Sequence, residues 1–285
     1  MSSMRKIKRQ IRPDLYGEVA RSVNNKLYTG NYPSYITFTD KEGIEKVIQT
    51  KEEAKSLEGG FNRSMCKKNC MTVPYSVSLR GMKMQNWNVM DDMKLQGKQF
   101  WKGDEWVINY LWTTLTHEAI FEIVKGARAG QEYLKEVVGR LDRPALWHTP
   151  IYDLPVYQAL FKSKEMRIKT VLGTLCILEF TDEPKRQKQL ASVAANFIHS
   201  IDAAVLMWVA DHVGGDLGVI HDCFLVHPNY GEDVRECYKE GYVAIMKEDP
   251  LKLFAKELDP EGKVEIPYVG DLDLDDVMDS EYIIS

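Results

Sequence analysis

The amino-acid sequence predicts a mostly helical α+β fold. Apolar residues recur at helical spacing in three long stretches, residues 14–27, 104–136 and 190–208. Two shorter stretches, residues 167–180 and 218–227, instead hold paired apolar runs around a glycine or a polar turn, which is typical of β-hairpins. A chain of 285 residues is long enough to bury the core of one large domain or two small ones.

The composition is that of a globular protein. Hydrophobic residues make up 44% of the chain and charged residues 28%. No apolar run approaches the ~18 residues that span a bilayer, and the basic N-terminus lacks the apolar segment of a signal peptide, so we expect no membrane contact. The five cysteines lack disulfide or zinc spacing, which indicates free thiols in a reducing compartment. A net charge of -5 argues against indiscriminate coating of nucleic acid but allows a local basic channel.

The first predicted helix follows a basic segment. Residues 1–12 carry five Lys or Arg residues and no acid, so we expect an arm that contacts a partner. Pro13 and Asp14 then open a helix, which Gly30 ends. Residues 34–60 are polar and charged, and they predict a surface excursion with short elements.

The other elements are predicted in the same way. Residues 104–136 form one amphipathic helix or a helix pair, and residues 145–157 form a strand followed by a proline-fixed turn. A last helix covers residues 232–246. The acidic C-terminal stretch, residues 271–285, contains apolar residues at intervals, so we expect it to pack against the protein rather than to form a solvated tail.

A helix predicted over residues 63–71 carries a cationic face. The residues that share this face recur at every fourth position: Arg63, Lys67 and Met71. Lys68 adds a cation on an adjacent side, and Pro74 predicts a break just before Tyr75. Two cations one helical turn apart can hold adjacent oxygens of a polyphosphate. A solvated basic helix explains the same composition, so both interpretations are open at this point.

The hairpin predicted over residues 218–227 has His221 and Asp222 at its turn. Apolar residues lead into this turn and out of it on both sides, so we expect a buried hairpin. A buried carboxylate is costly to desolvate unless it meets a cation. Asp222 is therefore a candidate metal ligand, with an ordinary structural turn as the alternative.

Two further stretches carry weaker signals. His199 lies on the helix over residues 190–208 among apolar neighbours, with Asn196 and Asp202 nearby, which is typical of a hydrogen-bonded core histidine. The first arm of the hairpin over residues 167–180 is basic. Its cations are Lys162, Lys164, Arg167 and Lys169. Such a ribbon is either an ordinary edge hairpin or one that enters a DNA groove.

Together these stretches resemble the C-terminal half of a single-subunit DNA-dependent RNA polymerase, the type found in phages, mitochondria and mitochondrial plasmids. The family's fingers motif, Arg-x3-Lys-x3-Met-Thr-x2-Tyr, is matched by Arg63, Lys67, Met71, Thr72 and Tyr75. Its palm motif, His-Asp-Ser-Phe, is matched by His221, Asp222, Cys223 and Phe224.

Four other segments extend the resemblance over nearly the whole chain. The family's Trp-x-Thr-Pro element is matched at residues 147–150, and its Asn-Phe-x-His-Ser-x-Asp helix at residues 196–202. Residues 14–24 are similar to the segment that follows the family's first palm motif. Residues 274–282 are similar to the family's C-terminal end. Five motifs in the family's order are specific, although each alone is modest.

The sequence departs from the family pattern at several positions. Ser76 stands where the family has Gly, and Pro74 precedes the tyrosine. Cys223 and Leu225 replace Ser and Gly after the palm aspartate. The family's first palm motif, Asp-Gly-x3-Gly-x2-His, supplies a second metal-binding aspartate and is expected upstream of residue 14, where these 285 residues do not contain it.

The resemblance implies the palm and fingers of a right-hand polymerase fold, with a small antiparallel palm sheet and a specificity-type β-hairpin. The implied segments are an N-terminal arm with the palm-to-fingers connection at residues 1–60, fingers at 61–145, the specificity-type hairpin at 146–185, and the palm with its metal hairpin and a C-terminal foot at 186–285.

The resemblance also implies a mechanism of nucleotidyl transfer with two Mg²⁺ ions. Asp222 would be a metal ligand. Arg63 and Lys67 would bind the triphosphate of the incoming NTP, with Lys68 as a third candidate, and Lys67 would assist departure of pyrophosphate. Tyr75 and His199 would sense the ribose 2′ hydroxyl.

The expected partners follow from the same resemblance. A second subunit of a split, heterodimeric phage enzyme would carry the N-terminal domain and the first palm aspartate, and it would share the two Mg²⁺ ions. DNA template, nascent RNA and NTPs are the other expected partners, and the need for an accessory DNA-binding factor is open. No transit peptide is evident, which favours the cytoplasm of an infected cell over an organelle matrix.

Three alternatives are weighed against this interpretation. An HD-type metal phosphohydrolase would use His221 and Asp222 on a helix, with further His and Asp ligands nearby. A non-catalytic DNA-binding or structural subunit would keep the fold without the activity. A DNA polymerase of the related palm family usually has an acid after His-Asp, where this chain has Cys223.

Overall fold

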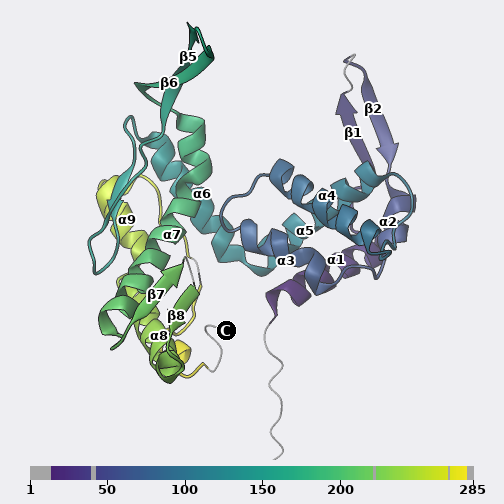
Figure 1. Cartoon of the computed structure of the whole chain (residues 1–285). Coiled ribbons are helices and arrows are strands. Elements are labelled where there is room, and N and C mark those ends of the chain that lie inside the picture. Colours follow the sequence, from purple (N-terminus) through teal and green to yellow (C-terminus); the bar gives the residue numbers. More distant parts are fainter. Residues whose placement is uncertain (1–13, 40–42, 221–222, 269, 281–285) are drawn as a thin grey trace, which may run out of the picture. The chain divides into compact units, whose positions relative to one another are not determined.

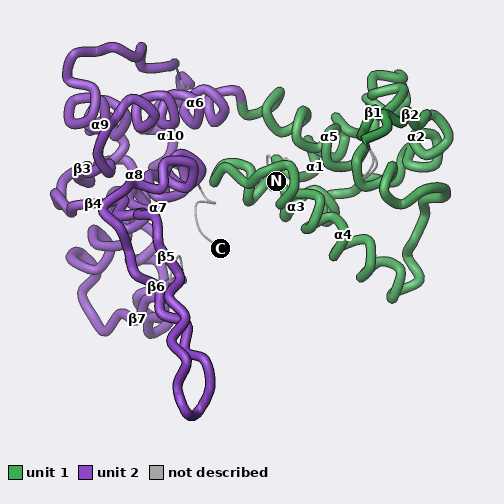
Figure 2. Tube along the Cα trace, turned by 90° about the horizontal axis from the view of Figure 1, so that it is seen from above, with its two compact units in different colours: residues 1–124 green, residues 125–285 purple. Residues whose placement is uncertain are grey.

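The computed structural model describes residues 14–280 apart from residues 40–42, 221–222 and 269 (Figure 1). The predicted mostly helical α+β fold is confirmed. The chain divides into two compact units, unit 1 within residues 1–124 and unit 2 within residues 125–285 (Figure 2). Throughout the described residues, every sheet is a two-stranded antiparallel hairpin.

Unit 1 is built around one central helix. Its helices are α1 (Leu15–Thr29), α2 (Lys51–Leu57), α3 (Arg63–Thr72), α4 (Leu79–Leu95) and α5 (Glu105–Ile123). The other four helices all pack against α5. Trp112 of α5 is fully buried and meets the edge of Phe61, with ring centroids 5.3 Å apart. Burial of these large apolar side chains supplies the main stabilisation of unit 1.

The first helix has the ends that the sequence predicts. α1 begins after Asp14 and ends at Gly30, whose φ of 74° is the left-handed conformation that glycine adopts without strain. Lys26 of α1 is buried, and its Nζ lies 3.6 Å from Glu118 and 2.6 Å from Glu122 of α5. Because two carboxylates meet it, this cation is tolerated beside the core.

The predicted surface excursion of unit 1 is a hairpin followed by a short helix. Strands β1 (Tyr35–Thr39) and β2 (Glu45–Gln49) pair with Ile36 opposite Ile48, and α2 follows directly. Figure 1 shows the hairpin standing out from the helices of unit 1. The short elements expected over residues 34–60 are therefore confirmed.

Unit 2 is also mainly helical. Its helices are α6 (Lys125–Arg140), α7 (Arg186–His212), the 3-10 helix η1 (Pro228–Tyr230), α8 (Gly231–Lys247), α9 (Pro250–Leu258) and α10 (Asp275–Met278). α7 packs against α6 and α8. Residues 104–136 are thus a helix pair, α5 and the first part of α6, with Val124 between them.

α7 is long and apolar enough to cross a membrane by length and composition alone. The same helix supplies buried residues to the core of unit 2, among them Val193, Phe197 and Val209. Core helices of globular proteins pass the same test, so the helix by itself is weak support for a membrane span.

The strands of unit 2 form three separate hairpins. They are β3 (Leu146–His148) with β4 (Pro155–Tyr157), β5 (Phe161–Thr170) with β6 (Gly173–Pro184), and β7 (Leu217–Ile220) with β8 (Cys223–Val226). The hairpin predicted over residues 167–180 is therefore present and longer than expected. Figure 1 shows β5 and β6 as a ribbon that projects beyond the helices of unit 2.

The β7–β8 hairpin corrects one expectation. It was predicted to be buried, but Ile220 is 62% exposed and Leu225 59% exposed. The alternate residues Leu217, Phe224 and Val226 pack against the buried cluster of Val209, Val213 and Val234. The apolar residues that suggested a fully buried hairpin thus lie on two faces, and one face alone is covered within this unit.

The acidic C-terminal stretch packs, as predicted, over its described part. α10 lies against α8. Lys239 of α8 is buried, and its Nζ lies 3.0 Å from Oε1 of Glu236 and donates to the carbonyl of Met278 at 3.2 Å. Lys247 pairs with Asp275 at 2.8 Å. Two lysines of one helix therefore hold the acidic segment in place.

Candidate functional site

The cationic face predicted on the helix over residues 63–71 is present on α3. Arg63, Lys67 and Met71 are exposed, whereas Met65 and Cys66 on the opposite side are buried in the core of unit 1. The helix covers the predicted residues and extends one further, to Thr72. The amphipathic spacing therefore presents the cations to solvent from a helix that the core holds in place.

The start of α3 is fixed to α1 by an asparagine. The side chain of Asn24 donates to the carbonyl of Phe61 at 2.8 Å and accepts from the backbone N–H of Phe61 at 3.2 Å. Asn62 then caps α3 by accepting from the N–H groups of Ser64 and Met65. The sequence interpretation gave Asn24 and Asn62 no role, although an Asn directly before a helix is a readable cap signal.

The C-terminal end of α3 is held by α4. Oε1 of Gln85 accepts from Nδ2 of Asn69 and from Oγ1 of Thr72, both at 3.1 Å. Both ends of α3 are therefore tied to neighbouring helices, which fixes the direction of its exposed cations.

Arg63 has two partners within unit 1. Its Nε donates to both carboxylate oxygens of Asp14, at 3.1 and 3.0 Å. Its Cζ lies 4.9 Å from the centre of the Tyr16 ring. Among the described residues, Lys67 and Lys68 have no ion pair and lie on the exposed side of α3. The side chains predicted to bind phosphate are thus brought together on one helix.

The two cysteines of α3 are structural. Burial raises the pKa of the Cys66 thiol to about 12 and that of the Cys70 thiol to about 11, so both are neutral at physiological pH. All five cysteines of the chain are free thiols, as predicted. Among the described residues, no cluster of three or more His, Cys, Asp or Glu side chains is placed to hold a metal ion.

The break predicted at Pro74 is confirmed, because α3 ends at Thr72 and a turn follows. Tyr75 comes directly after Pro74 and is 36% exposed. Ser76 has a φ of 61°, and its Oγ is buried with no hydrogen-bond partner among the residues that the structure describes. A left-handed conformation is costly for serine and not for glycine. Ser76 therefore holds a strained backbone conformation that glycine, the residue of the family pattern, would adopt without strain.

His199 lies on α7 in unit 2, and it is exposed. The expectation of a core histidine is therefore wrong, because its side of α7 faces outward while Phe197 and Ser200 face the core. Asp202, three residues further along, is exposed as well. The structure brings Arg63, Lys67, Lys68 and Tyr75 together in unit 1, and it describes His199 within unit 2.

Two motifs that are far apart in the sequence meet inside unit 2. The Nε1 of Trp147 donates to Oγ of Ser200 at 3.3 Å, which joins residues 147–150 to residues 196–202. Trp147 and Phe197 both contact the ring of Phe254, with centroids 5.3 and 5.4 Å away. Trp147, Phe197 and Ser200 therefore help to build the core that supports α7.

The turn after Trp147 is held by the threonine of its motif. Thr149 donates its backbone N–H to the carbonyl of Leu154 at 3.0 Å, and its Oγ1 accepts from the N–H of Leu154 at 3.0 Å. The Thr-Pro pair thus fixes the tight connection between β3 and β4, which is a packing role that the sequence pattern alone did not separate from a chemical one.

The prediction for His221 and Asp222 lies outside the described residues. The flanking segments are described, and they are strands β7 and β8, with Ile220 paired to Cys223. An HD-type phosphohydrolase needs the His-Asp pair on a helix, so the flanking strands contradict that alternative. The assignment of Asp222 as a metal ligand stays a prediction.

The β5–β6 ribbon is less basic than its first arm suggests. Lys162 pairs with Glu183 and Arg167 with Glu165, both at 2.7 Å. One face of the ribbon is apolar and exposed, with Met166, Ile168, Leu175 and Ile177. Two of its cations are thus neutralised within the ribbon, which offers a DNA groove less charge than the sequence indicates.

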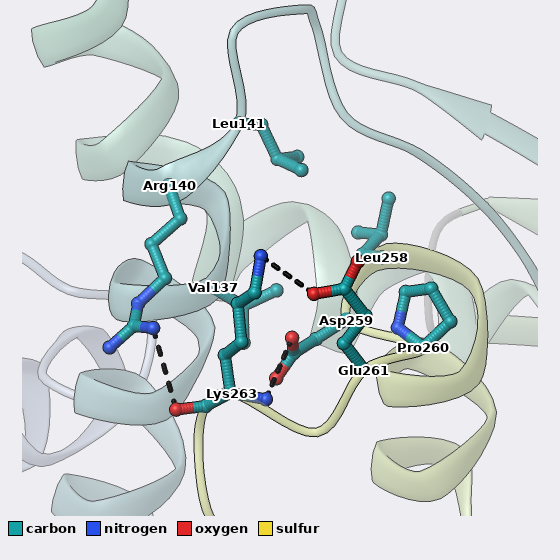
Figure 3. A pocket seen from close by; sticks show the side chains of 8 residues that line it. All are labelled: Val137, Arg140, Leu141, Leu258, Asp259, Pro260, Glu261 and Lys263. Carbon is teal, nitrogen blue, oxygen red and sulfur yellow. Dashed lines mark hydrogen bonds and ion pairs between the residues drawn. The ribbon is translucent and has the colours of Figure 1, made fainter.

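A small pocket lies in unit 2 (Figure 3). It is lined by the end of α6 and by the turn after α9. Arg140 donates to the carbonyl of Lys263, and Lys263 Nζ pairs with Glu261 at 2.8 Å. Its charged groups satisfy one another, and none of them is a predicted site residue.

Comparison with known proteins decides the family. A family model described as DNA-dependent RNA polymerase matches residues 6–265, which is most of the chain. The chain belongs to this polymerase family. The resemblance to polymerases of the phage and mitochondrial type, and the α+β polymerase fold that it implies, are therefore confirmed.

Individual relatives are DNA-directed RNA polymerases. The mitochondrial DNA-directed RNA polymerase of Mus musculus is 26% identical over 215 residues, covering 72% of this chain and 17% of the relative. The mitochondrial DNA-directed RNA polymerase 1 of Arabidopsis thaliana is 25% identical over 280 residues, covering 91% of this chain and 28% of the relative. DNA-directed RNA polymerase 2A of Nicotiana tabacum is 27% identical over 249 residues, covering 81% and 72%. The chain spans less than a third of the first two relatives.

Proposed function

We propose that this chain is the fingers and palm part of a DNA-dependent RNA polymerase, and that it takes part in template-directed ribonucleotide transfer. The observation that carries the proposal is the exposed face of α3. It presents Arg63 and Lys67 one helical turn apart, followed by Tyr75, inside a chain that belongs to the polymerase family.

The α3 cations suit a nucleoside triphosphate. A guanidinium and an ammonium at i and i+4 can contact neighbouring phosphate oxygens at the same time. As pyrophosphate leaves, negative charge builds up on its oxygens, and Lys67 stabilises that charge from a fixed position. Lys68, on the adjacent side of α3, is a third and more peripheral cation.

Other side chains would recognise the ribose of the incoming nucleotide. Tyr75 stands at the end of α3, and we propose that it closes over the nucleotide and, with His199, senses the ribose 2′ hydroxyl. Discrimination of this kind needs a polar group that is left without a partner when the hydroxyl is missing. If Tyr75→Phe left the preference for rNTPs over dNTPs unchanged, the role of Tyr75 would be refuted.

Asp222 is proposed as a ligand of Mg²⁺, because carboxylate oxygens are the ligands that this hard cation prefers. When bound, a pair of such ions activates the RNA 3′ hydroxyl and neutralises the leaving group. One carboxylate is a poor bridge between two ions. We therefore propose that the second aspartate, in the family's first palm motif, comes from outside these residues.

We further propose that a second polypeptide supplies that aspartate together with the N-terminal domain, as in a split, heterodimeric polymerase. This proposal rests on the need for a second metal-binding carboxylate, since two Mg²⁺ ions are usually bridged by more than one acidic side chain. DNA, nascent RNA and NTPs would then bind to the assembled pair. The cytoplasm of a phage-infected cell is the proposed location, and an organelle matrix is the alternative that the organellar relatives suggest.

The test is Mg²⁺-dependent RNA synthesis on a single-stranded DNA template. The chain is assayed alone and after co-expression with the polypeptide encoded beside it. Activity that needs the second polypeptide and is lost in Asp222→Ala supports the split active site. Full activity of the chain alone refutes the need for a second aspartate from outside. A complex that forms but synthesises no RNA supports the non-catalytic alternative.

A further inference from the structure

The guanidinium group of Arg63 contacts the protein through its Nε and through one of its two faces. Its Nε donates to Asp14, and its guanidinium lies over the ring of Tyr16. Within the described residues, its terminal nitrogens Nη1 and Nη2 donate no hydrogen bond, and the side chain is 58% exposed. The pair of donors that binds oxyanions most effectively is therefore not occupied by the described part of the protein.

Asp14 makes this contact instead of a local one. It is the N-cap of α1, with an extended backbone at φ −122° and ψ 92°. An aspartate at this position usually accepts from the N–H groups of the first turn of its own helix. Asp14 makes no such bond, and its carboxylate instead meets a side chain 49 residues further along the chain.

Gly17 gives the Asp14 carboxylate the space that this geometry requires. A Cβ at Gly17 would lie 2.8 Å from Oδ2 of Asp14. That separation is shorter than a carbon–oxygen contact allows, so a side chain at residue 17 would require the Asp14 carboxylate to shift from its position beside Nε of Arg63. The absence of a side chain at Gly17 therefore leaves room for Asp14 to contact Arg63.

We propose that Asp14 is a positioning residue, which orients Arg63 so that its two terminal nitrogens face the triphosphate of the incoming nucleotide. The proposal rests on the proposed function of Arg63 as a phosphate ligand. A simple charge effect has the opposite sign, because an anion beside the site repels a polyphosphate. The direction of the effect of removing Asp14 therefore separates orientation from charge.

The experiment is calorimetric titration of the whole chain with inorganic tripolyphosphate at low ionic strength, where exposed charges are least screened. Arg63→Met should weaken binding about tenfold or more, because a charged hydrogen-bonding group is lost. Asp14→Ala should weaken it roughly threefold to tenfold, because Arg63 must then be ordered on binding. Asp14→Asn should fall between wild type and Asp14→Ala, since its amide oxygen still accepts from Nε.

Combined variants distinguish positioning from a general structural effect. In an Arg63→Lys background, which keeps the charge but lacks Nε, Asp14→Ala should no longer weaken binding. Combined with Lys67→Met, the same substitution should weaken binding by the same factor as it does alone. Thermal unfolding of each variant, followed by circular dichroism, verifies that the fold is kept.

A glycine pair provides the matched control. Gly17→Ala leaves Asp14 and Arg63 unchanged in chemistry but shifts the carboxylate, so it should weaken binding by no more than Asp14→Ala does. Gly231→Ala also adds one methyl group to a helix, at a position where a Cβ meets no atom within 4 Å, and it should leave binding unchanged.

The outcomes separate the inference from the proposed function. If Arg63→Met weakens binding while Asp14→Ala strengthens it or has no effect, Asp14 is not a positioning residue and the phosphate role of Arg63 stands. An equal loss from Asp14→Ala in the Arg63→Lys background also overturns the inference. If the wild-type chain does not bind tripolyphosphate, or Arg63→Met binds equally well, the phosphate role and the inference both fail.

Discussion

The motif on α3 and the motif at residues 147–150 both match family patterns, but the structure places their residues differently. Arg63 and Lys67 of the first motif are exposed on a helix whose ends are tied to its neighbours. Trp147 and Thr149 of the second are buried, and they bond to Ser200 and Leu154. The comparison teaches that membership of a family motif does not separate chemistry from packing, whereas exposure and hydrogen-bond partners do.

The largest expected effect is on the packing side of this comparison. Trp147→Ala should lower the free energy of unfolding by about 3–5 kcal/mol, because it removes a fully buried indole and leaves a cavity. Trp147→Phe, which keeps a ring against Phe254 but loses the bond to Ser200, should cost clearly less. Urea unfolding of both variants measures the difference. Similar losses in the two variants would mean that the hydrogen bond dominates rather than the packing.

The next effect is on the chemical side. If the proposed function holds, Lys67→Met should weaken NTP use in RNA synthesis about tenfold to a hundredfold, with a small change in stability, since Lys67 is exposed. Lys68→Met should have a smaller effect. Lys55→Met, which removes an exposed lysine from α2 of the same unit, is the matched control and should change neither quantity. A large loss of stability in Lys67→Met would instead mean that Lys67 contributes to the packing of the folded protein, as Trp147 does.

Ser76 follows the tyrosine of the α3 motif, and its backbone is strained. A substitution there should therefore change stability, although the residue adjoins the exposed motif. Ser76→Gly should stabilise unit 1 by about 0.5–1 kcal/mol, since glycine adopts the φ of 61° freely and the substitution removes a buried hydroxyl that has no partner in the described part of the chain. Ser76→Ala removes the hydroxyl without relieving the backbone, so it should gain less. Denaturant midpoints rank the two variants, and a greater gain from alanine would refute the role of strain.

The smallest expected effect concerns the neighbour of Trp147. The Nδ1 of His148 lies 2.9 Å from Glu257, and this hydrogen bond raises the pKa of His148 above its ordinary value of 6.5. A raised pKa means that the folded state favours the charged imidazole. The resulting stabilisation is fully present below pH 6.5 and is lost as the pH rises through the raised pKa.

The melting temperature as a function of pH measures this effect. The wild-type protein should lose slightly more stability than Glu257→Gln as the pH rises from 6 to 8, which is about the range in which histidine titrates. His148→Gln should behave as Glu257→Gln does. Parallel curves for the wild-type protein and both variants would show that the pair contributes no pH dependence.

The sequence carried the elements of the fold because their signals are local. Helical spacing, Asp14 and Gly30 predicted α1, and Pro74 predicted the end of α3. The hairpin turn at Gly173 and the cationic face of α3 were also readable, since both depend on residues a few positions apart. The partial exposure of the β7–β8 hairpin could not be predicted, because a run of apolar residues does not reveal whether one face of a hairpin or both will be covered.

What the sequence by itself determined is the family, the order of the elements and the set of cations on α3. The tertiary structure alone decided which motif residues face solvent and which pairs meet. Asp14 contacts Arg63 and Trp147 contacts Ser200 across 49 and 53 residues, and no local pattern encodes such contacts. They exist because burial of the α5 core and of the Phe254 cluster brings distant helices and strands together, and side-chain partners follow from that packing.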